Sequence, residues 1–390
     1  MYKAKHSISL LFNANKVYDR QVIEGIGHYL QSSKVDWDVY LEEDCLARLE
    51  HIEEWVGDGI IADFDDPSFQ SALKNIKLPI IGVGGSYENE ADYPDVPYVA
   101  TDNLAVIRSA YEHLKQKGLE RFAFYGFPPD QNHRWAIERE NAVIKLCKLD
   151  GYECSIYRGH PTRPETWQYS MNRLSDWLQS LPNPVGVIAV TDARARHLLQ
   201  ACDHIGKMVP EHISIVGIDD DDIARNLSRI SLSSVTQGCF EMGYQAAKLL
   251  HHRLDNPNLK NKIVKVPPVG VAQRQSTDFK ALKDPYVIQA MHFIRQNACR
   301  GIKVDQVLDY VGISRSNLEN RFSEGLGHSI HTEIHNEKLT RACKMLQQGE
   351  VQTSEIASIC GYPSLQYMYA VFRKHFDKTP KEYRDECAAS

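Results

Sequence analysis

The chain has 390 residues, of which 43% are hydrophobic and 25% charged, and this composition excludes a disordered or fibrous protein. Its length corresponds to two or three domains of about 100–200 residues each. The formal net charge is -6, so the chain as a whole has no basic excess for nucleic acid. The charge is uneven, however: residues 1–284 carry a net charge of -7 and residues 285–390 a net charge of +1.

The nine cysteines are scattered along the chain, and no two of them are spaced as Cys-x-x-Cys. This pattern is typical of reduced thiols and argues against a disulfide framework or a zinc site. The apolar run at 8–12 is too short for a signal peptide, and no stretch reaches the ~18 apolar residues that a membrane helix needs. We therefore expect a cytoplasmic protein without membrane association.

Short apolar runs alternate with longer amphipathic stretches through the first 275 residues. The runs predict strands at 8–12, 37–41, 59–64, 78–85, 98–102, 121–127, 186–192 and 213–220. Between them, apolar residues at helical spacing predict helices, for example over 19–31, 103–116 and 193–205. This alternation predicts an α/β domain whose parallel strands are covered by helices on both faces.

Polar and aromatic side chains follow several of these strands where each strand ends. Parallel sheets bind their ligands at the carboxyl ends of the strands. Carboxylates accept hydrogen bonds from sugar hydroxyls, a guanidinium donates to them, and aromatic faces cover the ring C–H groups. Each residue alone is as well explained by a helix cap or an ion pair, but their common placement favours a sugar site. The candidates are Asn13, Tyr18, Asp19, Arg139, Asp192 and Asp219.

The segment GVIAVTDARARHLLQACDHIGKMVPEHISIVGIDD, followed by SLSSV and EMGYQAAKLL, resembles the effector domain of lactose/galactose-type repressors. The resemblance implies a periplasmic-binding-protein-like fold with two lobes hinged around a sugar cleft. It also implies that Asp192, Asp219 and Arg139 contact the sugar. Two departures stand out: the chain starts at the first strand without a DNA-reading headpiece, and Thr191 replaces the commoner Asn, which leaves the ligand open.

Other motifs in this half have simpler interpretations. GVGGS at 82–86 lacks the Gly-Lys-Ser/Thr ending of a phosphate loop and predicts a turn. The acidic runs at 63–66 and 219–222 lack the ligand spacing of a calcium loop, so we interpret them as a strand exit and a helix start. No catalytic spacing such as Gly-x-Ser-x-Gly or His-Glu-x-x-His occurs. We therefore expect no cofactor, no metal and no enzymatic activity.

The pattern changes at about residue 275, where a polar segment at 276–285 predicts a linker. Residues 286–390 predict an all-α domain. Within it, 305–323 has the pattern helix, glycine turn, helix, with Leu318 and Phe322 spaced to pack inward. The pattern recurs 50 residues later, at 353–376. Two copies predict a DNA-binding domain with two helix-turn-helix motifs.

The segment GYPSLQYMYAVFRKHFDKTPKEYR resembles the DNA-binding domain of the arabinose-activator family, with Asp377 where the family usually has Gly. The resemblance implies that both second helices enter successive major-groove segments. It assigns base-reading roles to Ser316, Glu319, Asn320, Leu365, Gln366 and Tyr369, and these side chains are expected to point away from the inward-packing faces. Basic side chains suited to phosphate contacts are Arg315, Arg321, Arg373, Lys374 and Lys381.

The two halves together resemble a family of xylose-responsive transcription activators. This resemblance implies D-xylose as effector, double-stranded promoter DNA and RNA polymerase as partners, and a homodimer formed through the sugar-binding domain, residues 1–275. The alternatives are the same architecture with arabinose or ribose as effector, and a cytosolic sugar-binding enzyme with a helical appendage. A DNA-alkylation sensor is a weaker alternative, because the nine cysteines are scattered rather than clustered.

Overall fold

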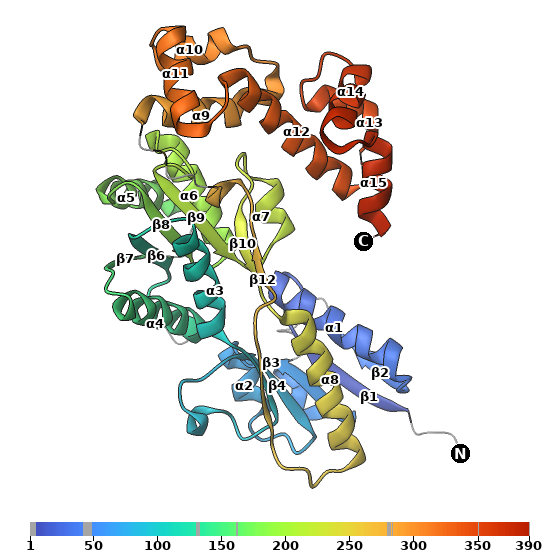
Figure 1. Cartoon of the computed structure of the whole chain (residues 1–390). Coiled ribbons are helices and arrows are strands. Elements are labelled where there is room, and N and C mark those ends of the chain that lie inside the picture. Colours follow the sequence, from blue (N-terminus) through green and yellow to red (C-terminus); the bar gives the residue numbers. More distant parts are fainter. Residues whose placement is uncertain are drawn as a thin grey trace. The chain divides into compact units, whose positions relative to one another are not determined.

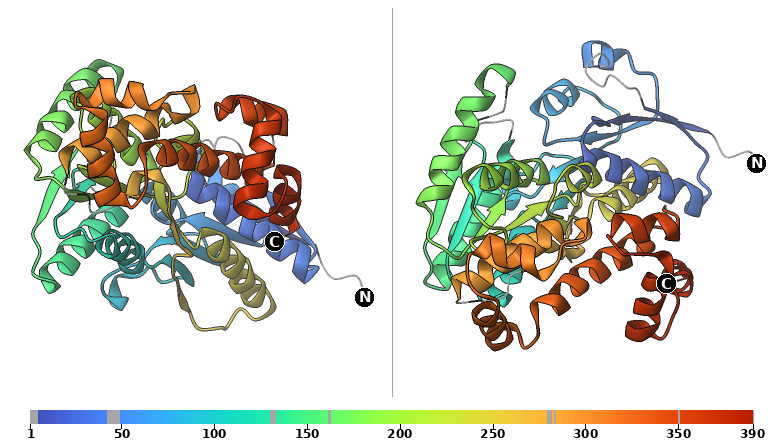
Figure 2. Two further views of the ribbon diagram at one scale, coloured as in Figure 1. Left: turned by 45° about the horizontal axis from the view of Figure 1, so that its top comes forward. Right: turned by 90° about the horizontal axis from the view of Figure 1, so that it is seen from above.

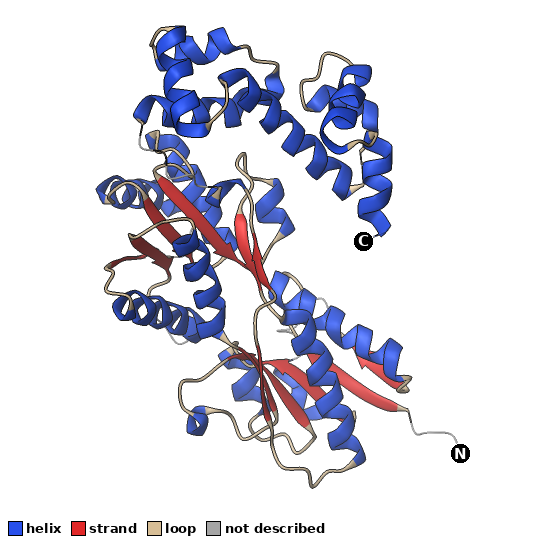
Figure 3. Ribbon diagram, viewed as in Figure 1, coloured by secondary structure: helices blue, strands red, loops and turns tan. Residues whose placement is uncertain are grey.

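The computed structural model describes residues 5–41, 49–129, 133–160, 163–278, 282, 284–349 and 351–389. Contacts divide the chain into two compact units, residues 1–279 and 280–390. The first unit contains strands with helices packed on them, and the second unit is helical in its described part (Figures 1 and 3). The predicted fold class, a two-lobed α/β domain followed by an all-α domain, is confirmed.

The described strands of the first unit form two six-stranded sheets, one in each lobe. Lobe 1 has the order β11-β5-β4-β3-β1-β2 with all neighbours parallel, as in the register of Leu10 with Ile61. Its strands are β1 His6–Leu11, β2 Trp37–Tyr40, β3 Gly59–Asp63, β4 Ile80–Gly85, β5 Tyr98–Thr101 and β11 Ile263–Val266.

Lobe 2 has the order β12-β10-β9-β8-β6-β7, in which only β12 runs antiparallel to its described neighbour. Its strands are β6 Phe122–Gly126, β7 Cys154–Arg158, β8 Val185–Ala189, β9 Ile213–Ile218, β10 Ser233–Thr236 and β12 Gly270–Ala272. Strands β7, β10, β11 and β12 are absent from the sequence-based prediction, because they are short or only half apolar and three of them lie at sheet edges.

Helices cover both faces of each sheet, and successive strand residues alternate between the two faces. In β6, for example, Phe122 and Phe124 join one buried cluster, while Ala123 and Tyr125 join another. The helices of lobe 1 are α1 Val17–Ser33, α2 Pro67–Leu73 and α8 Cys239–Asp255. Those of lobe 2 are α3 Asn103–Gln116, α4 Arg134–Leu149, α5 Trp167–Ser180, α6 Asp192–Ile205 and α7 Asp222–Asn226.

The chain crosses between the lobes three times within the described residues. It passes from β5 to α3 at Asp102, from β10 to α8 at Gln237–Gly238, and from β11 to β12 at 267–269. Each lobe is therefore built from segments far apart in the sequence. These crossings bring the carboxyl ends of the strands of both lobes to one cleft.

The second unit consists of helices that pack around two separate hydrophobic clusters. The long helix α12 connects the two clusters (Figure 2). The helices are α9 Pro285–Asn297, α10 Val304–Val311, α11 Arg315–Leu326, α12 Ile330–Gln348, α13 Thr353–Ile359, α14 Leu365–Phe376 and α15 Pro380–Ala389. Throughout the described residues of both units, no helix has the length and apolar character needed to cross a membrane.

The segment 276–285, predicted as a linker, is partly ordered into the two units. The hydroxyl of Ser276 donates to the backbone oxygen of Ile215 at 2.6 Å, and Ser276 and Thr277 are both buried. At the other end, Asp284 caps α9 and forms an ion pair with Arg321. The connection between the units is therefore shorter than the polar composition of this segment suggests.

Helices α1 and α8 lie side by side with their backbones in direct contact (Figure 1). A Cβ atom added at Gly25 would lie 1.9 Å from the backbone oxygen of Phe240, and one at Gly243 would lie 1.9 Å from that of Val22. Only glycine permits this approach. Because α8 enters lobe 1 directly from β10 of lobe 2, this contact holds the crossing between the lobes in place. It also forms part of the hydrophobic core of lobe 1.

We predict that Gly25→Ala lowers the free energy of unfolding by about 1–3 kcal/mol, because its methyl group has no space against α8. Gly27 lies on the same helix, and a Cβ atom there meets nothing within 4 Å. Gly27→Ala should therefore be neutral, or stabilising by up to about 1 kcal/mol. Urea unfolding of both variants measures the difference, and equal losses would contradict the helix contact.

Candidate functional site

A cavity of about 530 Å³ lies in the cleft between the two lobes. Its walls come from the residues that follow β1, β3, β4 and β5 in lobe 1 and β6, β8, β9 and β10 in lobe 2. The lining residues that matter below are Lys16, Tyr18, Asp19, Asp63, Asp65, Thr101, Asn103, Phe127, His133, Trp135, Arg139, Asp219 and Gln237. The strand exits therefore converge as the alternation of strands and helices predicts.

Asp19 lies in the first turn of α1 and is fully buried. Its Oδ2 accepts a hydrogen bond of 2.6 Å from the backbone nitrogen of Asn13, while its Oδ1 has no hydrogen-bond partner among the described groups. Burial and the nearby Asp63 raise the pKa of Asp19 to about 8, although Lys16 opposes the shift. An unpartnered oxygen on a lining residue is available to a ligand hydroxyl.

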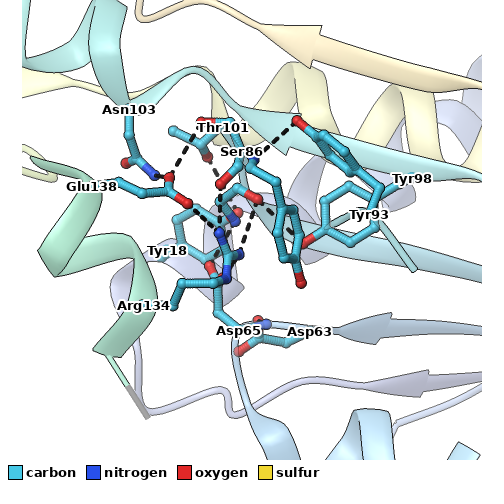
Figure 4. Close-up of polar contacts among 12 residues, drawn as sticks. Tyr18, Asp63, Asp65, Ser86, Tyr93, Tyr98, Thr101, Asn103, Arg134 and Glu138 are labelled. Carbon is cyan, nitrogen blue, oxygen red and sulfur yellow. Dashed lines mark hydrogen bonds and ion pairs between the residues drawn. The ribbon is translucent and has the colours of Figure 1, made fainter. Parts of the chain in front are cut away.

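A row of carboxylates follows β3 in lobe 1. Asp63 accepts hydrogen bonds from Lys16 Nζ at 3.0 Å and from the backbone nitrogen of Asp65 at 2.9 Å. Asp65 accepts from the backbone nitrogen of Gly85 at 2.8 Å and from Arg134 Nη2 at 2.9 Å (Figure 4). Burial and the charge of Asp63 raise the pKa of Asp65 to about 7 in spite of Arg134. The carboxylates are thus held in fixed orientations before any ligand contact.

Arg139 on α4 is the buried cation that lobe 2 contributes to the cavity lining. Its guanidinium donates to Asn103 Oδ1 at 3.0 Å, to the backbone oxygen of Val190 at 2.7 Å and to Gln237 Oε1 at 3.0 Å. It also lies over the ring of Trp135, 4.7 Å from the ring centroid. Burial lowers the pKa of Arg139, and the carboxylate of Asp219 opposes this effect. Arg139 therefore reaches two of the three chain crossings, at Asn103 and Gln237.

Asp219 follows β9 and lies in an unusual backbone conformation, with φ of 115°. Its Oδ1 accepts a hydrogen bond of 2.6 Å from Gln237 Nε2, which completes a chain of contacts from Arg139 through Gln237 to Asp219. Burial raises the pKa of Asp219 to about 6, while Arg139 lowers it. Strained backbone is concentrated at functional sites in proteins, and Asp219 lines the cavity.

Aromatic rings form the remaining wall on the side of lobe 2. The rings of Phe127 and His133 stack with centroids 4.6 Å apart, and Trp135 meets Phe127 edge to face at 6.0 Å. Across the cleft, the hydroxyl of Tyr18 lies 3.3 Å from Thr101 Oγ1. Apolar ring faces combined with fixed hydrogen-bonding groups are the composition that sugar sites use.

The cavity carries an excess of negative charge. Among its described lining residues, six aspartates face two cations, Lys16 and Arg139. Helix N-termini normally attract anions, but side chains of the chain already cap those of α2, α6 and α7 at the cavity. Asp66 accepts from the backbone nitrogen of Ser68 at the start of α2, and Asp221 accepts from that of Ile223 at the start of α7. The cavity therefore suits an uncharged ligand better than an anionic one.

Two of the predicted site residues, Asn13 and Asp192, are not among the residues that line the cavity. Asp192 is buried, and its two oxygens accept hydrogen bonds from Ser234 Oγ at 2.6 Å and from the backbone nitrogen of Asp221 at 2.7 Å. A Cβ atom at Gly217 would lie 2.0 Å from Asp192 Oδ1, so glycine leaves the space for this inward turn. The side chain of Asn13 accepts from the backbone nitrogen of Asn15. The other four candidates, Tyr18, Asp19, Arg139 and Asp219, do line the cavity.

Several lining residues are missing from the sequence-based candidates although they also follow strands. Asp63 and Asp65 were assigned to a plain strand exit, and Phe127, Asn103 and Gln237 were not singled out. The strand-exit rule alone points to them, because each one ends a strand or lies within two residues of its end. Among the described residues, no group of three or more His, Cys, Asp or Glu side chains is placed to hold a metal.

The second unit contains two helix-turn-helix motifs, α10–α11 and α13–α14. In the first, Gly312 turns the chain with φ of 77°, and Leu318 and Phe322 are buried. In the second, Gly361 turns with φ of 67°, and Met368 and Phe372 take the equivalent buried positions. The second helix of each motif exposes its opposite face, where most of the predicted DNA-contacting residues lie. Exposed residues on these faces are Arg315, Ser316 and Asn320 on α11 and Gln366, Arg373 and Lys374 on α14.

Some of the predicted base-reading and phosphate-contacting side chains are only partly exposed. Glu319 is half-buried, and its Oε2 accepts from the backbone nitrogen of Ile330 at the start of α12, at 3.3 Å. Arg321 pairs with Asp284 at 2.5 Å and donates to the side chain of Asn317. Half-buried side chains on α14 are Leu365, which packs against the second hydrophobic cluster, and Tyr369.

Models of three protein families match successive parts of the chain. The XylR N-terminal domain matches residues 7–104, a periplasmic binding protein-like domain matches 111–277, and a helix-turn-helix domain matches 307–386. The first two matches cover the two-lobed unit, and the third covers both motifs of the helical unit.

Full-length relatives have the same arrangement. The chain is 56% identical over 385 residues to the xylose operon regulatory protein of Escherichia coli strain K12, covering 99% of this chain and 98% of that protein. It is 49% identical over 387 residues to the protein of the same name from Haemophilus influenzae, covering 99% and 100%. The solved structure of a xylose-binding transcription activator matches with a TM-score of 0.91 at 54% identity over 99% of both chains. A cellobiose complex of the transcriptional regulator CelR, at 20% identity and a TM-score of 0.56, matches 69% of this chain and 84% of that chain, in fold alone.

The raised pKa values of the cavity carboxyls predict how stability depends on pH. Between about pH 4 and pH 8 the folded protein holds protons on Asp19 and Asp65 that the unfolded chain has lost, so the free energy of unfolding falls as pH rises through this window. Asp19→Asn should make the fall in the free energy of unfolding with pH shallower. The control variant Asp176→Asn, at an exposed position of α5, should leave it unchanged. Urea unfolding at about pH 5 and about pH 8 measures the slope, and equal slopes in both variants would contradict the burial of the Asp19 charge.

Proposed function

The chain belongs to the family of xylose operon regulatory proteins, and from this premise we propose that it is an activator of transcription that binds D-xylose in the cleft of its first unit and promoter DNA through its second. The observation that carries the proposal is the convergence, in one cavity, of Asp19, Asp65, Arg139 and Asp219 with the aromatic wall. These groups match the hydroxyls and the C–H faces of a small uncharged sugar.

In the proposed binding mode, the sugar contacts both lobes at once. Asp19 of lobe 1 has an oxygen without a protein partner, and Asp219 of lobe 2 lies at the end of the hydrogen-bonded chain from Arg139. A ligand that bonds to both carboxylates favours the closed arrangement of the lobes over a more open one. Sugar binding can change DNA affinity only if the lobe arrangement that the sugar favours is also the one that binds DNA better.

In the proposed DNA complex, the exposed residues of α11 and α14 face two major-groove segments of the promoter. Ser316, Asn320 and Gln366 are the base-reading candidates, while Arg315, Arg373 and Lys374 are suited to phosphates. Tyr369 and Glu319 are half-buried, so any base contact would use only part of each side chain. Arg321 is better explained as a support for the start of α9, through Asp284.

The proposal includes three further elements, which concern assembly, transcription and cellular location. Two copies of the chain, paired through the sugar-binding unit, would place two double-motif readers on repeated half-sites. The bound pair would then recruit RNA polymerase to the promoter. Such a protein works where the chromosome is, so we place it in the cytoplasm.

The decisive experiment is a binding titration at fixed salt concentration on DNA from upstream of a pentose-catabolism operon. We expect D-xylose to tighten sequence-selective binding on the order of tenfold, a typical coupling between two sites. D-arabinose, D-ribose and a phosphorylated pentose serve as comparison ligands, and the acidic cavity predicts that the phosphorylated pentose binds poorest. Asp219→Asn should abolish the response to xylose while sugar-free DNA binding persists. Selective DNA binding that ignores every sugar would remove the effector from the proposal.

The two classes of DNA contact can be separated by mutation. Gln366→Ala should cost about 1–3 kcal/mol of binding at one base pair and relax specificity there. Lys374→Ala should instead weaken binding on all sequences and reduce the dependence on salt, by about one unit of slope. Binding to a set of single-base operator variants at several salt concentrations tests both. A uniform loss for Gln366→Ala would make it a positioning residue.

A further inference from the structure

A second set of polar contacts joins the lobes beside the cavity. It centres on Arg134, the first residue of α4 in lobe 2, and on Glu138 one turn further along the helix (Figure 4). Neither residue lines the cavity, and neither is needed to explain the proposed sugar contacts. Apart from each other and Asn103 at the start of α3, their partners lie on the strand exits of lobe 1.

Arg134 reaches from lobe 2 to three neighbouring positions of lobe 1. Its Nη2 donates to Asp65 Oδ1 at 2.9 Å and to the backbone oxygen of Gly85 at 3.1 Å, and its Nη1 donates to the backbone oxygen of Ser86 at 2.5 Å. The guanidinium also lies over the ring of Tyr87, 3.7 Å from the centroid. One side chain therefore contacts the exits of both β3 and β4.

Glu138 completes the contact from the same helix. One of its oxygens accepts a hydrogen bond from Arg134, and the other accepts from Asn103 Nδ2 at 2.8 Å and from Ser86 Oγ at 3.3 Å. Asn103 is also an acceptor for Arg139, the buried cation of the cavity. Glu138 thus connects the lobe 1 contact to the chain crossing between β5 and α3.

The lobe 1 side of this contact is a rigid platform. The rings of Tyr87, Tyr93 and Tyr98 pack on one another with centroids 4.8 to 6.0 Å apart. The hydroxyl of Tyr93 accepts from the backbone nitrogen of Tyr87, and that of Tyr98 donates to the backbone oxygen of Gly85. Arg134 therefore binds to a surface that is already fixed.

The backbone of lobe 1 also comes unusually close to lobe 2 here. A Cβ atom at Gly85 would lie 2.9 Å from Asn103 Nδ2 and 3.2 Å from the Cβ atom of Trp135. Glycine at this position lets the end of β4 meet α3 and α4 directly. This tight fit is independent of the ion pair and lies at the same point of the cleft.

The charges in this contact are largely removed from water. The side chains of Arg134, Asp65 and Glu138 are 28%, 13% and 19% exposed. Burial alone would lower the pKa of Arg134, but Asp65 and Glu138 raise it above its usual value. Removing one partner of a buried ion pair is strongly destabilising, because the other charge stays behind without compensation. Such a contact favours the arrangement of lobes in which it is complete.

We propose that Arg134 and Glu138 form an inter-lobe clamp, which holds Asp65 at the cavity wall and stabilises the closed lobes, so that it raises effector affinity without touching the effector. Because neither residue lines the cavity, the clamp acts alongside the ligand in closing the cleft. Arg134 and Glu138 are positioning residues in this scheme. The inference rests on the proposed function for the identity of the effector, D-xylose.

The test is a calorimetric titration of full-length protein with D-xylose, together with stopped-flow dissociation. Arg134→Ala should raise the dissociation constant on the order of tenfold, because a smaller fraction of the protein occupies the closed form. The loss should come mainly from faster dissociation. Arg134→Lys keeps the charge without the planar fork and should give an intermediate value. Glu138→Gln keeps the side-chain shape and provides a second variant should Arg134→Ala fold poorly.

The matched control is Arg158→Ala. Arg158 of β7 pairs with Glu140, which lies on α4 like Arg134, but this ion pair links only elements of lobe 2. The control variant should leave xylose affinity unchanged even where it lowers thermal stability. Equal affinity losses in Arg158→Ala and Arg134→Ala, or wild-type affinity in both clamp variants, would overturn the clamp.

Amide hydrogen exchange separates this inference from the proposed function. The backbone nitrogen of Gly85 donates to Asp65, the residue that the clamp holds. In sugar-free protein, exchange at Gly85 should be faster in Arg134→Ala than in wild type or Arg158→Ala. If wild type binds no xylose and Gly85 still shows this difference, the proposed effector fails and the clamp stands. Unchanged exchange at Gly85 would remove the clamp whatever the effector is.

Discussion

The buried guanidinium of Arg139 is the contact on which the organisation of the cleft depends. It holds Asn103, where the chain leaves lobe 1, Gln237, where the chain returns to it, and the backbone after β8. A charge so deeply buried is stable only with its hydrogen bonds satisfied, so these segments keep their places. Asp219, the aromatic wall and the clamp of Arg134 and Glu138 are all arranged around α4 and its neighbours. The positions of Asn103, Gln237 and, through Gln237, Asp219 therefore follow from one satisfied cation.

The helical unit repeats one structural plan with different surfaces. The buried positions of α11 and α14 correspond pair by pair, since Leu318 and Phe322 match Met368 and Phe372. At the exposed positions, Ser323 and Glu324 of the first motif correspond to Arg373 and Lys374 of the second. A phosphate backbone attracts the second surface far more strongly than the first. The second motif is thus better suited to contacts with the phosphate backbone than the first.

Much of the architecture could be predicted from sequence, because strand–helix alternation and the repeated glycine turn are local patterns. Tyr18, Asp19, Arg139 and Asp219 were found by the strand-exit rule and do line the cavity. The rule finds positions but not side-chain directions, and Asp192 shows the difference. It turns inward because Ser234 donates to it and because Gly217, one strand away, leaves room. Likewise, the pairing of Arg321 with Asp284 depends on how α9 packs, which no local pattern reveals.

The acidic lining of the cavity and the capped starts of neighbouring helices limit which molecules can act as a signal for the protein. A site lined mainly by carboxylates, with the starts of α2, α6 and α7 already capped by side chains, has little to offer a phosphate. Where a cell captures its sugar by phosphorylation, such a sensor would no longer bind each molecule once that step had taken place. Its transcriptional activity would then depend on the concentration of free sugar, which is set by uptake and phosphorylation together. It would not depend on the rate of catabolism itself. In a cell that phosphorylates the sugar quickly, the concentration of free sugar would fall, and transcription of the catabolic genes would fall with it. The acidic cavity would provide this negative feedback, because it excludes the phosphorylated product.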